Sequence, residues 1–218
     1  MGWALRFWNS SVGKKAVMAI TGLVGLGFVL GHMLGNLQVY LGREQLNGYA
    51  EALHHNLPLL WGTRVVVLLA VLLHLVAAVE LQGMKNAARP VGYKKPGNIQ
   101  ATAQSRTMIL SGVILLAFIA FHLMHLTLGN AHPSFIPLDA YGNLVRGFSV
   151  WWVSAFYIVA MGLLGMHLSH GAFSMFFSVG LIHPKYKNAT RAVTYGLMLL
   201  VVLGNISIPV AVLTGVVK

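Results

Sequence analysis

The sequence predicts an all-α integral membrane protein whose five transmembrane helices form a bundle. Hydrophobic residues make up 57% of the 218 residues and charged residues only 9%, which is not the composition of a water-soluble domain. Five apolar runs are long enough for an α-helix to cross the ~30 Å hydrocarbon core of a bilayer, and none alternates as a transmembrane β-strand does. We therefore expect a single membrane domain over residues 1–218.

The spans are placed from the flanks of these runs. An aromatic and basic segment that includes Trp3, Trp8 and Lys15 comes first and predicts an interfacial lead-in to the first span. Trp61 and Trp151 stand where the second and fourth spans begin, as tryptophan does at membrane interfaces. Connectors with proline and glycine separate the second, third and fourth spans. The five helices are expected at about residues 15–41, 61–84, 106–129, 151–177 and 192–217.

Lysine and arginine are distributed unevenly between the two ends of these spans. Of the 15 basic residues, eleven flank the start of the first span or the connectors around residues 94 and 187, and four flank the opposite ends. Cytoplasmic connectors are enriched in Lys and Arg, so we expect the N-terminus in the cytoplasm and the C-terminus outside. The net charge of +11 is interpreted as this topology signal, and no nucleic-acid partner is expected.

Four of the ten histidines, His32, His74, His122 and His167, lie one in each of the first four spans. At 1.5 Å per residue, His32 and His122 lie about 24–26 Å from the cytoplasmic edge, and His74 and His167 lie about 20–24 Å from the outer edge. A lone intramembrane histidine is well explained by an interhelical hydrogen bond, but two depth-matched pairs are what two haems with histidine axial ligands require. Cysteine is absent, so thiolate ligation is excluded. We expect a bundle that holds two haem b groups, their iron bound by these four residues.

Two of these histidines have a neighbour that could replace them. His125 follows His122 by three residues and His170 follows His167 by three, a step of about 60° around a helix. Spacing alone therefore leaves both choices open. Small residues beside the histidines would let a flat macrocycle approach the backbone or would simply serve helix packing; they include Gly27, Gly31, Gly35, Gly162, Gly165 and Gly171.

Three acidic or basic groups are candidates for proton chemistry. Glu51 and His55 lie in the outer segment before the second span, and both can exchange protons near neutral pH. They predict a quinone site, with a solvated loop as the alternative. Glu80 is the one carboxylate within an apolar run, and we expect it to be interfacial or ion-paired, with a proton relay as the alternative.

At these residues the chain resembles the cytochrome b membrane-anchor subunit of succinate:quinone oxidoreductases, in the form with one five-helix polypeptide and two haems. This family comprises the succinate dehydrogenase (respiratory complex II) and fumarate reductase anchors, and the likeness covers nearly the whole chain. The stretches that carry it are Thr21 to Leu23, Gly31 to Asn36, Leu73 to His74, Gly112 to His122 and, most specifically, His167 to Ser174.

The resemblance implies several further properties. It implies that His32 and His122 hold the outer haem and that His74 and His167 hold the inner one, in preference to His125 and His170. It implies electron transport between a cytoplasmic iron–sulfur subunit, bound to a flavoprotein subunit, and membrane quinone, menaquinone in particular, in the cell inner membrane. The chain would then be the non-succinate-binding subunit of a tricarboxylic acid cycle enzyme, with no catalytic residue of its own for succinate, in complexes that can associate further. The basic stretch Arg89 to Lys95 is a candidate for docking the soluble subunits.

Two rival functions remain open. The chain could be the cytochrome b subunit of another quinone-linked dehydrogenase, of the hydrogenase or formate dehydrogenase type. It could also be a haem-free transporter that uses intramembrane histidines for protons or metal ions. The haem content separates the transporter from the two redox functions.

Overall fold

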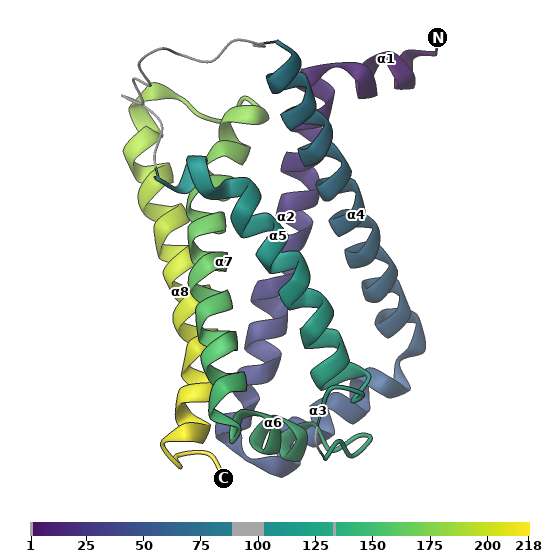
Figure 1. The fold of residues 1–218 in the computed structure, drawn as a ribbon, viewed down its shortest axis with the longest axis vertical. Coiled ribbons are helices and arrows are strands. Elements are labelled where there is room, and N and C mark those ends of the chain that lie inside the picture. The colour runs from purple at the N-terminus through teal and green to yellow at the C-terminus, as the bar shows by residue number, and fades with distance from the viewer. Residues whose placement is uncertain (1, 89–102, 133) are drawn as a thin grey trace.

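The computed structural model describes residues 2–88, 103–132 and 134–218, and in these ranges every regular element is a helix (Figure 1). Five helices are long and apolar enough to cross a membrane, over Ser11–Leu41, Leu57–Ala87, Ser105–Thr127, Trp151–Ser178 and Pro184–Leu213. The predicted all-α class and the five spans are confirmed, and the chain is a multi-pass membrane protein. The long helices are α2 (Ser11–Asn36), α4 (Leu57–Ala87), α5 (Ala103–His122), α7 (Trp151–Ser178) and α8 (Lys187–Leu213).

The bundle is built around α2 and α7. Helix α2 packs against α4 and α7, and both α5 and α8 pack against α7. Consecutive long helices run in opposite directions, so the two chain termini lie at opposite ends of the bundle (Figure 1). The side chains that face outward are largely apolar, for example Leu68 and Leu203. In a bilayer such faces contact lipid, which removes the cost of exposing them to water.

Capping residues start two spans earlier than the apolar runs predict. The Ser10 side chain accepts a hydrogen bond from the backbone N–H of Gly13 at 2.9 Å, so α2 begins at Ser11 rather than near residue 15. Asn56 caps α4 in the same way through Leu59, and Pro58 occupies the first turn. These side chains satisfy backbone N–H groups that have no partner within the helix. Hydropathy locates the part of a helix that lies in the membrane, whereas the caps decide where the helix ends.

The expected interfacial lead-in is the short helix α1 (Trp3–Asn9), which turns away from α2 (Figure 1). The junction is held by Lys14, whose ammonium donates to the Trp8 carbonyl at 2.6 Å and pairs with the Glu80 carboxylate of α4 at 3.0 Å. Glu80 is therefore ion-paired, through a lysine of another helix. The backbone approaches closely here, because a Cβ on Gly13 would overlap the Phe7 carbonyl.

At the opposite end, two connectors expected as loops contain helices, α3 (Arg43–His55) and α6 (Ala140–Phe148). Asp139 joins them: its carboxylate accepts from Arg43 at 2.6 Å, Asn47 at 3.1 Å and Arg146 at 3.1 Å. It also caps α6 through the N–H of Gly142 at 3.0 Å. Burial alone would raise the pKa of Asp139, but these hydrogen bonds lower it to about 2. The remaining short helices are η1 (Leu37–Leu41), η2 (Leu123–Thr127) and η3 (Pro184–Tyr186).

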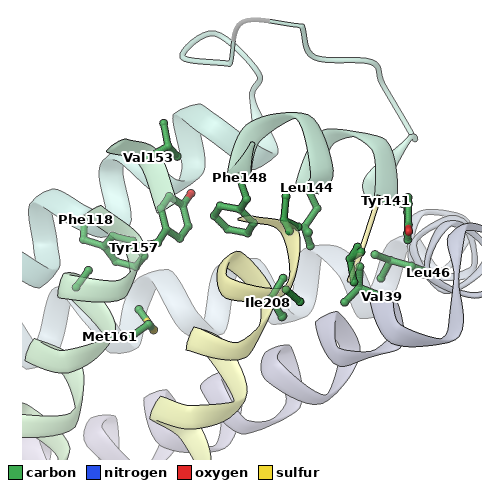
Figure 2. Close-up of a cluster of buried hydrophobic side chains, with 14 residues drawn as sticks. Val39, Leu46, Phe118, Tyr141, Leu144, Phe148, Val153, Tyr157, Met161 and Ile208 are labelled. Carbon is green, nitrogen blue, oxygen red and sulfur yellow. The ribbon is translucent and has the colours of Figure 1, made fainter. Parts of the chain in front are cut away.

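A buried apolar cluster lies beneath α6, where it meets the ends of α5, α7 and α8 (Figure 2). Phe118, Phe148 and Tyr157 form its aromatic part, and Tyr141, Leu144 and Ile208 extend it toward the C-terminus. Because this end is closed by protein, side chains here are held by packing and hydrogen bonds rather than by lipid.

Candidate functional site

The four histidines singled out by depth lie in two pairs, each formed by rings from two different helices. His32 of α2 and His122, the last residue of α5, have ring centroids 5.7 Å apart with the ring planes at 89°. His74 of α4 and His167 of α7 have centroids 6.3 Å apart with the planes at 53°. We call His32 and His122, which lie toward the end closed by α6, the outer pair. We call His74 and His167, which lie toward the end that carries α1, the inner pair. Helical rise predicted the depth of each pair, and the structure brings His122 and His167, rather than His125 and His170, into the pairs.

The ring separation fits a shared metal. An imidazole nitrogen lies about 2 Å from the metal it binds, and with about 1 Å from nitrogen to ring centre, two trans ligands stand roughly 6 Å apart. The observed 5.7 and 6.3 Å lie on either side of this value. In the described ranges no group of three or more His, Cys, Asp or Glu residues could enclose a metal ion. A metal bound by either pair would therefore have to bring its other ligands, as the iron of a porphyrin does.

Hydroxyl groups orient both rings of the inner pair. The Thr21 hydroxyl lies 3.0 Å from Nδ1 of His74, and the Ser111 hydroxyl lies 3.2 Å from Nδ1 of His167. Each hydroxyl donates its own hydrogen to a carbonyl one turn earlier in its helix, at 2.7 Å for Thr21 and 3.0 Å for Ser111. Each oxygen therefore accepts a hydrogen from Nδ1, which leaves Nε2 with a free lone pair. This is how proteins fix the tautomer and direction of a metal-binding histidine.

Neither hydroxyl was assigned a role of its own from the sequence, although Thr21 begins one of the stretches that carry the resemblance and the spacing of both residues contains a signal. Thr21 precedes His32 by eleven residues on α2, and Ser111 precedes His122 by eleven on α5. Eleven residues are close to three turns, so each hydroxyl lies on the same face as the histidine and about 16 Å along the helix. Each of these helices thus supports one ring at the inner level and supplies one ring at the outer level.

The alternative histidines face elsewhere. After His122 the chain enters the π-helical turn η2, which holds more residues than an α turn and rotates His125 further from His122 than an α-helix would. His125 is fully buried and stacks on His132, with ring centroids 4.9 Å apart and planes at 22°. Stacked rings do not direct their nitrogens at a shared metal. His170 lies 3.3 Å from the Ser174 hydroxyl of its own helix.

The glycines near the histidines divide into two groups. A Cβ on Gly35 would overlap the Tyr49 ring, and a Cβ on Gly165 would lie 2.8 Å from Val202 of α8, so these two serve helix packing. Others have open space where a Cβ would stand, and these are Gly27, Gly31 and Gly162. His32 itself is exposed to the outside of the protein, and the other three paired histidines are half-buried.

The quinone candidates Glu51 and His55 lie one turn apart on α3, with the carboxylate 3.5 Å from Nε2 of the ring. Their side chains are 66% and 80% exposed, at the same end of the bundle as the outer pair. A surface hollow of about 460 Å³ lies at this end too, lined by Asn130, Ala131, His132, Val150, Trp152 and Val153. The candidate docking stretch from Arg89 to Lys95 falls outside the described residues.

Comparison of the chain with protein-family models, curated proteins and solved structures finds no match.

Proposed function

We propose that the chain is the membrane-anchor cytochrome b subunit of a succinate:quinone oxidoreductase, which carries electrons between an iron–sulfur subunit and membrane quinone with two haem b groups. The observation that carries the redox part is the arrangement of two histidine pairs whose ring centroids, 5.7 and 6.3 Å apart, would leave room for a metal between them. The succinate part rests on the resemblance of Gly31 to Asn36 and His167 to Ser174 to that family. The histidine pairs support the rival hydrogenase or formate dehydrogenase subunits equally well. The sequence resemblance supports only the succinate:quinone oxidoreductase anchor.

In this function the paired histidines would hold the two haems. His32 and His122 would hold the outer haem iron, and His74 and His167 the inner one. When bound, haem b supplies reversible one-electron chemistry at its iron. The hydroxyls of Thr21 and Ser111 accept hydrogen bonds from Nδ1 of the inner rings and so keep Nε2 available. These hydrogen bonds also make the rings stronger electron donors to the iron. The apolar helix faces keep bulk water away from both levels.

The distribution of basic residues supports a cytoplasmic position for the end that carries α1. Eleven of the 15 Lys and Arg residues flank that end. A flavoprotein and an iron–sulfur subunit would dock there, beside the inner histidine pair. Quinone, menaquinone in the form the resemblance implies, would react at the outer end, where Glu51 and His55 can exchange protons.

The haem content of the purified protein tests the redox part. The pyridine haemochrome assay should give two haems b per chain. His32→Ala and His74→Ala should each reduce this to one, whereas the matched variant His170→Ala should retain two. A folded chain that binds no haem when haem is supplied would overturn the proposal and favour the transporter.

Copurification tests the enzyme class. Mild solubilisation of membranes should recover the chain with a flavoprotein and an iron–sulfur protein, together with succinate-dependent quinone reduction. Recovery of hydrogenase or formate dehydrogenase subunits instead would replace the succinate assignment and keep the dihaem function.

A further inference from the structure

The hydroxyl of Tyr157 lies between two histidines of the neighbouring helix. Its oxygen is 3.2 Å from Nδ1 of His122 and 3.0 Å from Nδ1 of His125. The Tyr157 ring is itself packed edge-on against Phe118 and Phe148, with centroids 5.0 and 4.8 Å away (Figure 2). The hydroxyl is thus fixed in place by the buried cluster.

Counting hydrogens gives the bonds a direction. A tyrosine hydroxyl can donate one hydrogen bond and accept others. If His122 binds iron through Nε2, its hydrogen is on Nδ1 and is donated to the Tyr157 oxygen. The Tyr157 hydrogen then points to Nδ1 of His125, and His125 carries its own hydrogen on Nε2. Both contacts of the tyrosine are satisfied in this order.

Ring packing fixes His125 in the position from which its Nδ1 contacts the Tyr157 hydroxyl. Phe121 stacks on one side of its ring at 5.4 Å, and His132 stacks on it at 4.9 Å. His132 is fixed in turn, since its Nε2 lies 2.9 Å from the Asn143 carbonyl. The ring is fully buried, and among the described residues its Nε2 has no hydrogen-bond partner. Buried polar atoms are usually paired, and among the described residues the Tyr157 hydroxyl is the polar partner of this ring, through Nδ1.

We infer that Tyr157 and His125 are positioning residues for the outer haem: together they fix the tautomer and direction of His122 and set the reduction potential of the iron it holds. The inference rests on the proposed function. The hydrogen bonds around His122 differ from those of the inner pair, where each supporting hydroxyl donates to a carbonyl of its own helix. The outer ligand is instead supported from α7, through a chain that ends on a buried histidine.

The test is reductive titration of the purified dihaem protein with the Tyr157→Phe variant. The change removes only the hydroxyl and keeps the ring contacts. Without the hydroxyl, the His122 imidazole is a weaker electron donor to the iron, and this favours the reduced state. The reduction potential of the outer haem should therefore rise, by roughly a tenfold change in the reduction equilibrium or about 59 mV for one electron. The inner potential should stay the same. The low-spin electron paramagnetic resonance signal of the outer haem should also change, because the His122 ring is freer to turn.

Tyr141→Phe is the matched control, because Tyr141 lies at the same end and its hydroxyl donates to the backbone carbonyl of Lys218 at 2.9 Å. It should leave both potentials unchanged. His125→Leu should keep two haems and raise the outer potential less than Tyr157→Phe, because the tyrosine oxygen remains but is a weaker acceptor. This variant also serves as the test if Tyr157→Phe does not fold.

Four results would overturn the inference: unchanged outer signals in Tyr157→Phe, unchanged outer signals in a folded His125→Leu variant, an equal shift in Tyr141→Phe, or loss of a haem in His125→Leu. In each case the wild type still contains two haems, so the proposed function stands. A wild type without haem would instead remove the proposed function itself.

Discussion

Replacing Glu80 by glutamine should destabilise the protein more than replacing its partner Lys14 by methionine. The Lys14 side chain is only 6% exposed, whereas that of Glu80 is 40% exposed. Glu80→Gln therefore leaves a buried ammonium whose remaining contacts are the Trp8 carbonyl at 2.6 Å and the Trp8 ring at 5.2 Å. Lys14→Met leaves a carboxylate whose Oε2 is buried but whose side chain is 40% exposed and can be hydrated from that side.

The difference can be estimated from the burial of each partner. Breaking a buried ion pair from one side costs about 3–5 kcal/mol, and the retained Trp8 contacts place Glu80→Gln near 3 kcal/mol. Exposed pairs are worth about 0–1 kcal/mol, so Lys14→Met should cost about 1 kcal/mol. The double variant should also cost about 1 kcal/mol, because without Lys14 there is no buried charge to leave unpaired. The two single variants thus differ by about 2 kcal/mol, roughly a thirtyfold change in the unfolding equilibrium.

The assay is a double-mutant cycle measured by loss of helical signal during unfolding in mixed micelles of detergent and dodecyl sulfate. Lys15→Met is the control, since Lys15 is adjacent and exposed, and it should have little effect. Equal losses in the two single variants, or losses that add in the double variant, would refute the assignment of a buried lysine held by Glu80.

Three further predictions concern the end of the bundle that carries α3 and α6. Because the native pKa of Asp139 is about 2, below its ordinary value of 3.8, its carboxylate stabilises the fold above about pH 4. This contribution should be lost as the pH falls toward 2, and in Asp139→Asn thermal unfolding should lack that acid-dependent step; a wild-type step that survives in the variant would assign it to another group. Gly147→Ala should cost about 1–3 kcal/mol, because the new Cβ would stand 2.7 Å from the His125 ring. Gly48→Ala meets nothing within 4 Å and should be neutral or stabilising in the same unfolding assay. Glu51→Gln combined with His55→Asn should slow quinone reduction several-fold at unchanged haem content, and an unaltered rate would exclude the pair from the quinone site.

The sequence predicts what depends on regular geometry. Run length places the five spans, and a rise of 1.5 Å per residue predicts the depths of the two pairs. Spacing left His125 and His170 as alternatives, and the structure brings His32 opposite His122 and His74 opposite His167. It does not predict where helices begin, because that depends on single caps such as Ser10. Glycines were also ambiguous, since a small residue beside a ligand and one beneath a packed helix look the same in sequence.

The supporting residues differ in how far they could be foreseen. The hydroxyls of Thr21 and Ser111 repeat at a spacing of eleven before a histidine, so the pattern was visible once its meaning was known. Tyr157 has no such pattern. It reaches His122 from another helix. His125 faces Tyr157 because of the π-helical turn η2, which holds more residues than an α turn. No local sequence pattern predicts such a turn.

The eleven-residue spacing on α2 and α5 fixes the distance and the rotation between the inner and outer histidine levels along each helix. Deleting one residue between Thr21 and His32 would leave the inner ring supported but turn the outer ring by about 100° and draw it about 1.5 Å closer. No loop lies between the two positions to absorb such a change. Length changes in this stretch must therefore keep the ring on the same face, and the shortest that nearly does so is about seven residues, or two turns and roughly 10.5 Å, on both helices at once.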